Sequence, residues 1–261
     1  SKDFQFTSKS PDASFTWFCD TTIGFGSAGS GNYLPDFIAT NTGTDSVKAK
    51  VTVKVTASSN QCPGSDSSIF TITVLPTPHF ISAKEKSVCD TTVFEYTALS
   101  SATATTFSWK RDFADGIDNP ADSAGISNIN EILHNTADTP VIITYAFNLS
   151  TGEGAGCNTP ETLTVTVNPT PVLENIPGQT YCNALAVNDG IKFESTSTNP
   201  VPAFTWTCNR SIGFGSSGSG IIPAFIASNP GNGAINATVT GYITASSDNC
   251  KGAPVKFPVT V

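Results

Sequence analysis

Apolar and polar residues alternate along much of the chain. In residues 47–57, VKAKVTVKVTA, the residues Val47, Val51 and Val55 fall on one face, and lysines and threonines fall on the other. This period of two is typical of a half-buried strand, because successive side chains of a strand point to opposite faces. Similar alternation recurs at 70–74, 141–149, 163–167 and 257–261. Helical periodicity is nearly absent, and only residues 126–137 suggest a short helical turn. The pattern predicts an all-β chain.

Two segments of the chain are close copies of each other. Residues 15–39 read FTWFCDTTIGFGSAGSGNYLPDFIA, and residues 204–227 read FTWTCNRSIGFGSSGSGIIPAFIA. A more diverged copy lies between them, with FSW at 107–109 and GC at 156–157. The three tryptophans are spaced 92 and 97 residues apart. A fixed period of this length indicates tandem structural repeats.

Repeats of this size, with several short strands and one Trp on an early strand, predict tandem immunoglobulin-like β-sandwich modules. We expect modules at residues 1–75, 79–168 and 172–261, joined by the linkers Pro76-Thr77-Pro78 and Pro169-Thr170-Pro171. The first module is expected to lack its first strand, so the chain reads as a piece of a longer array. Short proline linkers favour extended, stiff joints. This arrangement predicts an extended row of modules rather than a binding pocket.

Composition narrows the classes of function. The chain has 261 residues with a net charge of −8, and only 13% of its residues are charged. An acidic chain lacks the basic face that a nucleic-acid partner requires. No apolar run is long enough for a membrane span. Ser and Thr supply 65 residues, which suits strands that face water with hydroxyl groups.

The motifs also resemble a known family. Trp followed by IGFGS-x-GSG, then P-x-F-x-A, a single Cys and a strand ending in V-N-P-T-P is similar to the PKD-like, Ig-like repeats of large Bacteroidetes surface adhesins. These adhesins are exported by the type IX system and include gliding-motility adhesins. The resemblance implies a secreted, extracellular cell-surface adhesin or stalk with no catalytic role. Its implied partners are neighbouring modules of the same chain and a surface polysaccharide or other cell-surface ligand.

Seven cysteines recur at related positions, which in a surface-type sequence favours disulfides. The middle module holds only Cys89 and Cys157, so we expect these two to pair. The equivalent pair in the third module is Cys182–Cys250, and Cys62 is then left without a partner. Cys19 and Cys208 follow their Trp by two residues and should point into the core as free thiols. A competing scheme pairs Cys19 with Cys62 and Cys208 with Cys250, leaving Cys182 free.

Two features carry a functional and a structural interpretation. Gly24 to Gly29 and Gly213 to Gly218 spell G-x-G-x-x-G, but the residues that follow are broken by Pro and are not helical. A dinucleotide site needs a helix there, so we interpret both segments as flexible or tightly turned surface loops or as irregular edge strands. The tryptophans could stack on sugars, but one Trp at the same place in each module favours a core residue.

His79 and His134 show no catalytic arrangement, and no cofactor is expected.

One acidic cluster is a weak calcium candidate. It comprises Asp112, Asp115, Asp118 and Asp122, with Asn119 and Gly116 between them. Hard oxygen ligands on a loop can bind Ca²⁺, but the spacing does not match an EF-hand loop. A solvated acidic loop is the preferred interpretation.

The resemblance also raises O-glycosylation at Asp-Ser/Thr motifs. The candidate acceptors are Thr21, Ser46, Thr91 and Ser123. Short motifs of this kind arise easily by chance in a chain rich in Ser and Thr.

The leading hypothesis for function is therefore a non-catalytic repeat segment of a long adhesin, acting in gliding or attachment. One alternative is a set of glycan-binding modules attached to a secreted polysaccharide-degrading enzyme. Another is a filament subunit in which one protomer donates a strand to the next.

Overall fold

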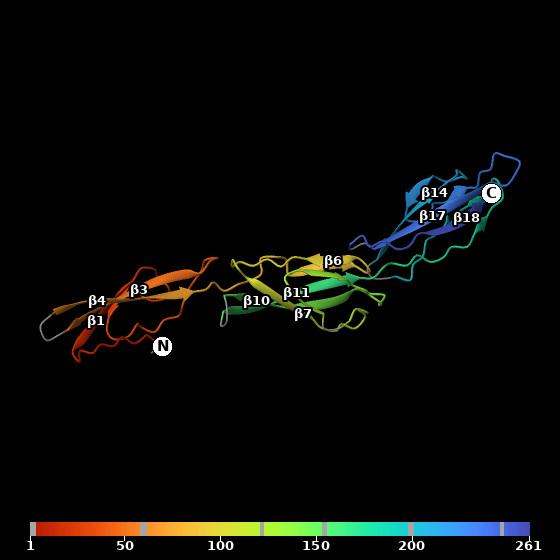
Figure 1. Ribbon diagram of the computed structural model, residues 1–261. Helices are drawn as coiled ribbons and strands as arrows, with labels where there is room; N and C mark the ends of the chain where they lie inside the picture. Colours follow the sequence, from red (N-terminus) through yellow and green to blue (C-terminus); the bar gives the residue numbers. More distant parts are fainter. Residues whose placement is uncertain (1–3, 58–61, 121–122, 153–155, 198–200, 246–247) are drawn as a thin grey trace. The chain divides into compact units, whose positions relative to one another are not determined.

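The computed structural model describes residues 4–57, 62–120, 123–152, 156–197, 201–245 and 248–261 (Figure 1). Within these ranges every regular element is a strand. The helical turn suggested at 126–137 is wrong, because this stretch holds a β-strand at Ile129–Ile132. By contact density the chain divides into two compact units, residues 1–82, 98–108 and 147–161 in one and residues 83–97, 109–146 and 162–261 in the other. The three-module division of the sequence remains a prediction; first, second and third module denote its residue ranges 1–75, 79–168 and 172–261.

The first module contains a four-stranded sheet of order β2-β1-β3-β4. Its strands are β1 (Ala13–Cys19), β2 (Ala28–Ser30), β3 (Val47–Ala57) and β4 (Cys62–Val74). Ala49, Val51 and Val53 of β3 are buried, as the alternating pattern predicts.

The second and third modules repeat one topology. Each has a five-stranded sheet, β5-β11-β10-β7-β8 and β12-β18-β17-β14-β15, and each adds a two-stranded sheet, β6-β9 and β13-β16. Strands of the second module are β5 (Glu85–Cys89), β6 (Val93–Tyr96), β7 (Thr106–Arg111), β8 (Ser123–Ile126), β9 (Ile129–Ile132), β10 (Val141–Thr151) and β11 (Cys157–Asn168). Strands of the third are β12 (Gln179–Thr180), β13 (Ala186–Val187), β14 (Pro202–Cys208), β15 (Ser217–Ser219), β16 (Phe225–Ile226), β17 (Asn236–Ala245) and β18 (Val255–Thr260).

The first strand of each of these two modules pairs in parallel with the last. Cys89 of β5 lies opposite Asn168 of β11, and Thr180 of β12 lies opposite Thr260 of β18. In the first module β4 occupies the position of β11 and β18, and it forms the edge of the sheet described there. The position of the first strand therefore decides where its cysteine lies.

Three asparagines mark equivalent positions in the modules. The side-chain amides of Asn41, Asn135 and Asn229 donate to the carbonyls of Val74, Val167 and Val261 at 2.9, 2.7 and 2.7 Å. Each valine lies within one residue of the end of the last strand of its module, so each asparagine ties the preceding loop to the end of that strand. This contact makes Leu75 the counterpart of Asn168.

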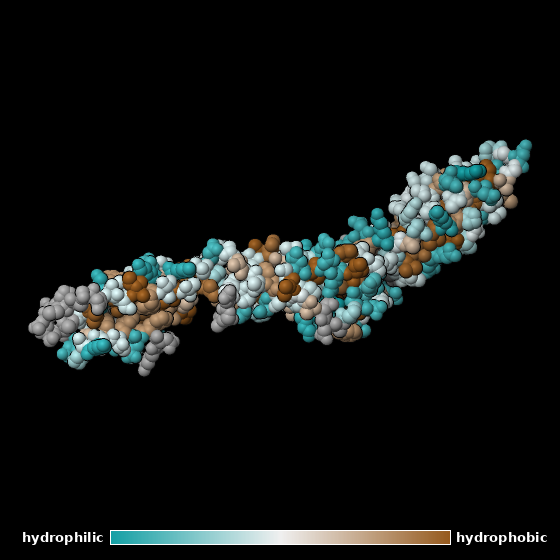
Figure 2. Space-filling model, in the orientation of Figure 1, coloured by the Kyte–Doolittle hydropathy of each residue, from teal (hydrophilic) through white to brown (hydrophobic). Residues whose placement is uncertain are grey.

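The cores are built around the three tryptophans, which are 4%, 8% and 3% exposed at positions 17, 109 and 206. This confirms the core interpretation and removes the tryptophans as sugar-stacking platforms. Cys19 and Cys208 are buried beside Trp17 and Trp206, as predicted. The visible surface is mostly pale to teal, with small brown hydrophobic patches (Figure 2).

Candidate functional site

A disulfide joins the second and third modules. Cys89, at the end of β5, is bonded to Cys250, which lies between β17 and β18, with their Cα atoms 5.5 Å apart. The bond closes a sequence separation of 161 residues. It links two of the predicted modules, and both cysteines lie in the same compact unit of the chain.

This bond corrects the predicted cysteine pairing. Neither Cys89–Cys157 nor Cys182–Cys250 forms, and the competing Cys208–Cys250 pair does not form either. The cause is the parallel pairing of β5 with β11. Cys89 lies at the end of β11, whereas Cys157 begins this 12-residue strand. At about 3.3 Å per residue the two cysteines lie at opposite ends of the sheet.

A polar clamp surrounds the disulfide. The Ser87 hydroxyl donates to Asp248 Oδ2 at 2.5 Å, and the Asn168 amide donates to Ser87 Oγ at 2.8 Å and also to Asp248 Oδ2. The linker is tied as well, because the Thr170 hydroxyl donates to Asp90 Oδ2 at 2.9 Å. The Ser87–Asp248 and Thr170–Asp90 bonds are exposed, so we expect modest energies that fix orientation more than stability.

The linker also packs closely against the third module. A Cβ placed on Gly252 would lie 2.0 Å from the Pro171 carbonyl oxygen. Only glycine permits the turn before β18 to approach the linker backbone this closely. Linker, turn and disulfide therefore form one joint.

The first joint is held without a covalent bond among the residues described. Thr103 donates its backbone N–H and its hydroxyl to the Thr44 carbonyl at 2.8 and 3.2 Å, and its hydroxyl also contacts Asp45. The buried Thr151 hydroxyl donates to the Pro76 carbonyl at 2.8 Å. Cys157 is free and half-buried, with its sulfur 4.0 Å from the Leu75 carbonyl oxygen. Cys62 has no described side chain.

The Gly-rich segments close over the tryptophans. A Cβ placed on Gly29, Gly125 or Gly218 would lie 2.3 to 2.6 Å from the nearest indole carbon of Trp17, Trp109 or Trp206. The middle module therefore keeps the Trp–Gly contact although its sequence lacks the motif. Gly24 and Gly213 have φ near +118°, which glycine adopts readily. Each segment begins as a loop and ends in a short edge strand, β2 or β15, which contains Gly29 or Gly218.

The structure does not bring together the three candidate calcium ligands that it describes. Asp112, Asp115 and Asp118 are exposed, and Asp112 pairs with Lys110 at 3.2 Å. Asp122 lies outside the described residues. Among the residues described, no group of three or more His, Cys, Asp or Glu could hold a metal ion. Asn119 instead fixes the loop, because its amide donates to the Ile132 carbonyl at 2.6 Å.

The glycosylation candidates differ in accessibility. Ser46 and Thr91 are exposed, and Thr21 is half-buried. The side chain of Ser123 lies outside the described residues. Glycosylation at these positions remains a prediction.

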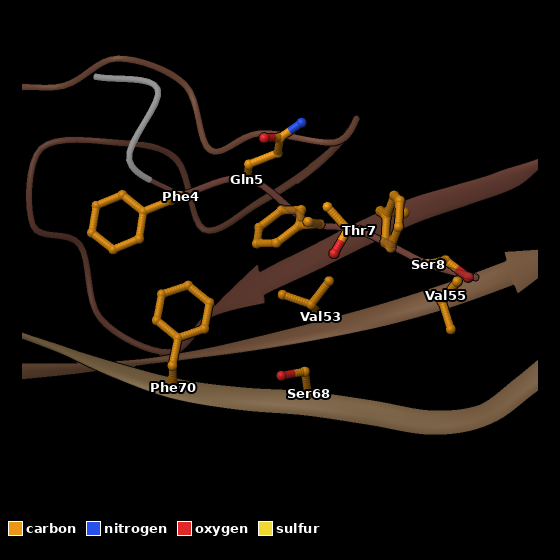
Figure 3. A pocket seen from close by; sticks show the side chains of 10 residues that line it. Phe4, Gln5, Thr7, Ser8, Val53, Val55, Ser68 and Phe70 are labelled. Carbon is orange, nitrogen blue, oxygen red and sulfur yellow. The ribbon is translucent and has the colours of Figure 1, made fainter. Parts of the chain in front are cut away.

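A cavity of about 440 Å³, lined by aromatic and aliphatic side chains and by Gln5, Thr7, Ser8 and Ser68, opens in the first module (Figure 3). Phe4, Phe6 and Phe15 line it together with valines of β3 and with Phe70 of β4. Phe4 stacks on Phe70 with ring centroids 5.7 Å apart, and Phe6 lies 5.9 Å from Phe15. These rings are half-buried, whereas Phe193 and Phe257 of the third module are 6% and 1% exposed.

No family model matches the chain, and no curated protein matches it in sequence. Among solved structures, it is similar to the three N-terminal domains of the bacteriophage RB49 Highly Immunogenic Outer Capsid protein, with 12% identity, 97% of this chain and 86% of that chain covered, and a TM-score of 0.42. It is also similar to mouse Protocadherin-24 EC1-3, with 12% identity, 100% and 92% coverage, and a TM-score of 0.33. It is similar to DIP-gamma IG1+IG2 as well, with 14% identity, 71% of this chain and 96% of that chain covered, and a TM-score of 0.33.

These likenesses concern the fold alone. The chain is all-β, built of tandem immunoglobulin-like β-sandwich modules. In the described part of the chain, no helix is long and apolar enough to cross a membrane.

Proposed function

We propose that the chain is a non-catalytic, load-bearing segment of a secreted cell-surface adhesin. The observation that carries this proposal is the Cys89–Cys250 bond between modules. Disulfides persist in oxidising compartments outside the cytoplasm, which favours an extracellular location. A bond between modules serves a chain that must hold its modules together under load.

The mechanism is the removal of freedom at a joint. A three-residue linker alone permits bending, because its backbone dihedrals are still free to rotate on either side of the prolines. The disulfide adds a second attachment point, and the clamp of Ser87, Asn168 and Asp248 adds a third set of contacts. With two attachments on different strands, the third module cannot swing freely about its linker.

The partners in this proposal are neighbouring modules of the same chain and a polysaccharide or other ligand of the cell surface. Ser46 and Thr91 are proposed as O-glycan acceptors because both hydroxyls are exposed. Intact-mass measurement of native material tests this point, and an unmodified mass would remove it.

Single-molecule extension tests the load-bearing role. With the disulfide intact, the stretch between Cys89 and Cys250 cannot extend, so unfolding the whole chain should fall short by roughly 540 Å, at about 3.4 Å per residue. Cys89→Ser should restore this length. Cys182→Ser is the matched control, because Cys182 is an exposed free thiol and its loss should leave the extension unchanged.

Equal extension of the wild-type and Cys89→Ser chains would contradict the load-bearing proposal. Location is tested separately by labelling intact cells with an antibody to the chain. Signal that appears only after permeabilisation would contradict the extracellular assignment.

A further inference from the structure

The first module offers a strand edge that its counterparts cover. β11 and β18 each pair on their outer side with a parallel first strand, β5 or β12. β4 holds the same place in its sheet, and among the residues described that outer side is unpaired. The covered counterparts within this one chain show what kind of segment fits the edge.

A repeated serine contact fixes the register of that segment. Ser8 Oγ accepts the backbone N–H of Ser10 at 3.1 Å, as Ser195 Oγ accepts that of Ser197 at 3.0 Å. Ser8 is thereby the counterpart of Ser195, and Phe6 takes the place of Phe193.

The serine counterparts each form an isolated bridge with an apolar residue that precedes the first strand. Ser195 pairs with Leu173, and Ser100 in the second module pairs with Phe80. Leu173 lies over the core beside Phe193, and Phe80 lies 5.0 Å from Phe147 between ring centroids. In the first module, Ser8 and Phe6 instead line the open cavity (Figure 3). The cavity of the first module therefore lies at the position that Leu173 fills in the third module and Phe80 fills in the second.

A thiol stands at the other end of the same edge. In the second module Cys89 lies opposite Asn168, whose counterpart in the first module is Leu75. The Cys157 sulfur is 4.0 Å from the Leu75 carbonyl oxygen. A strand added to β4 in the same register would bring its cysteine to Cys157, as Cys89 is brought to Cys250.

We propose that the β4 edge, the cavity and Cys157 together form an acceptor site for an extended segment with an apolar anchor and a cysteine nine residues later. Residues 171–182, PVLENIPGQTYC, and residues 78–89, PHFISAKEKSVC, both have this pattern. The occupant is the first strand of an immunoglobulin-like module of this type. It pairs in parallel with β4, its anchor fills the cavity, and its cysteine bonds to Cys157.

The covalent step is a thiol–disulfide exchange. The segment's cysteine enters as a mixed disulfide with glutathione. The Cys157 thiolate attacks the sulfur of the segment's cysteine, the new S–S bond forms, and glutathione leaves as its thiolate. Glutathione carries away the electron pair, so no further oxidant is required.

A synthetic peptide tests the site on the intact chain. The probe is the peptide PVLENIPGQTYC carrying glutathione on its cysteine, and the adduct is located by mass spectrometry of a digest. Binding raises the effective concentration at Cys157, so the adduct should form about tenfold faster there than at the exposed Cys182. A matched peptide with Asp in place of the anchor Leu should lose this preference, because a carboxylate is costly to bury among the phenylalanine rings of the cavity.

Hydrogen exchange supplies a readout that does not depend on the thiol. A peptide with Ser in place of Cys should protect backbone amides of β4 within residues 67–74 and leave those of β18 unchanged. The proposal is overturned if the adduct forms mainly at Cys182 or Cys62. It is equally overturned if the Asp peptide reacts as fast at Cys157 or if β4 gains no protection.

Discussion

At the scale of single residues, the second module differs from its neighbours in one buried charge. Arg111 stands two residues after Trp109, where Cys19 and Cys208 stand in the other modules, and it is 1% exposed. Its Nε donates to Glu131 Oε2 at 3.1 Å, and its Nη2 donates to the Pro120 carbonyl at 2.9 Å. The Tyr145 hydroxyl donates to the same Glu131 oxygen at 2.8 Å.

Glu131→Ala should destabilise the second module by about 3–5 kcal/mol, because it leaves the Arg111 guanidinium buried without its carboxylate. The free energy of unfolding from urea denaturation measures this loss. Glu95→Ala is the control, since Glu95 is exposed and should change stability by no more than about 0.5 kcal/mol. A Glu131→Ala chain as stable as the control would show that the ion pair contributes nothing.

Tyr145 should make the protein sensitive to alkaline pH. Burial raises the pKa of Tyr145, and the hydrogen bond and charge of Glu131 raise it further. The folded state therefore keeps the phenol proton above pH ~10, where the unfolded state loses it, so stability is full below that pH and falls as pH rises. The fall should approach about 1.4 kcal/mol per pH unit. Tyr145→Phe should remove this part of the slope in urea titrations from pH 8 to pH 11.

An unchanged slope in Tyr145→Phe would mean that other groups cause the alkaline loss. Tyr181, whose pKa burial also raises, stays in both chains and therefore cancels from the comparison.

The sequence predicts some of these residues and misses others. Trp17, Cys19 and Cys208 are buried as the strand period requires, since residues two apart share a face. By the same rule Arg111 lies on the same buried face as Trp109. The sequence does not show, however, which residue neutralises its charge. Glu131 is 20 residues away on another strand, and no local period connects the two.

At the scale of elements, the contact between the Trp and a glycine of the short edge strand recurs in every module. Gly218 of β15 lies opposite Trp206 of β14, and Gly29 of β2 lies opposite Trp17 of β1. A side chain at either position would overlap the indole ring, so the glycine leaves the space that the ring needs. The small strand is therefore held to the sheet by the Trp face as well as by its ladder.

Gly218→Ala should cost about 1–3 kcal/mol, because its methyl group would lie 2.5 Å from a Trp206 ring carbon and force the indole to move. Thermal denaturation and the near-ultraviolet signal of Trp206 measure the effect. Gly233→Ala is the matched control, because a Cβ there meets no atom within 4 Å. Equal behaviour of the two variants would contradict the packing role of Gly218.

Among the elements, long alternating strands are predictable and the first strands are not. β3 and β10 show their period over 11 residues each, so their faces follow from the sequence. β12 has two residues, too few for any period, and nothing local shows that it runs parallel to β18. The predicted disulfides failed for this reason, because their pairing depends on the direction of the first strand.

At the scale of the whole molecule, the disulfide ties the stability of the third module to a residue outside it. When the third module unfolds with the bond intact, its chain remains fixed at the linker and at Cys250. The closed loop restricts the unfolded ensemble, which stabilises the folded state. The effect reaches residues far from Cys89 in sequence.

Cys89→Ser should therefore destabilise the third module by about 4 kcal/mol in the loop-entropy model, although the substitution lies in the second. Hydrogen exchange measures it, as faster exchange of the β17 amides under mild denaturant. Amides of β3 in the first module are the internal control and should keep their rates. Unchanged exchange in β17 would show that the bond does not restrain the unfolded third module.

The parallel pairing of first and last strands has a consequence for how the modules break. Once the Cys89–Cys250 bond is reduced, tension enters the second module through the start of its first strand and leaves through the end of β11, so it pulls the two strands along each other. The ladder from Glu85 to Cys89 is then loaded in shear, with its hydrogen bonds strained together. An antiparallel hairpin pulled from its open end would instead unzip one bond at a time. We expect shear geometry to let the module yield late and abruptly.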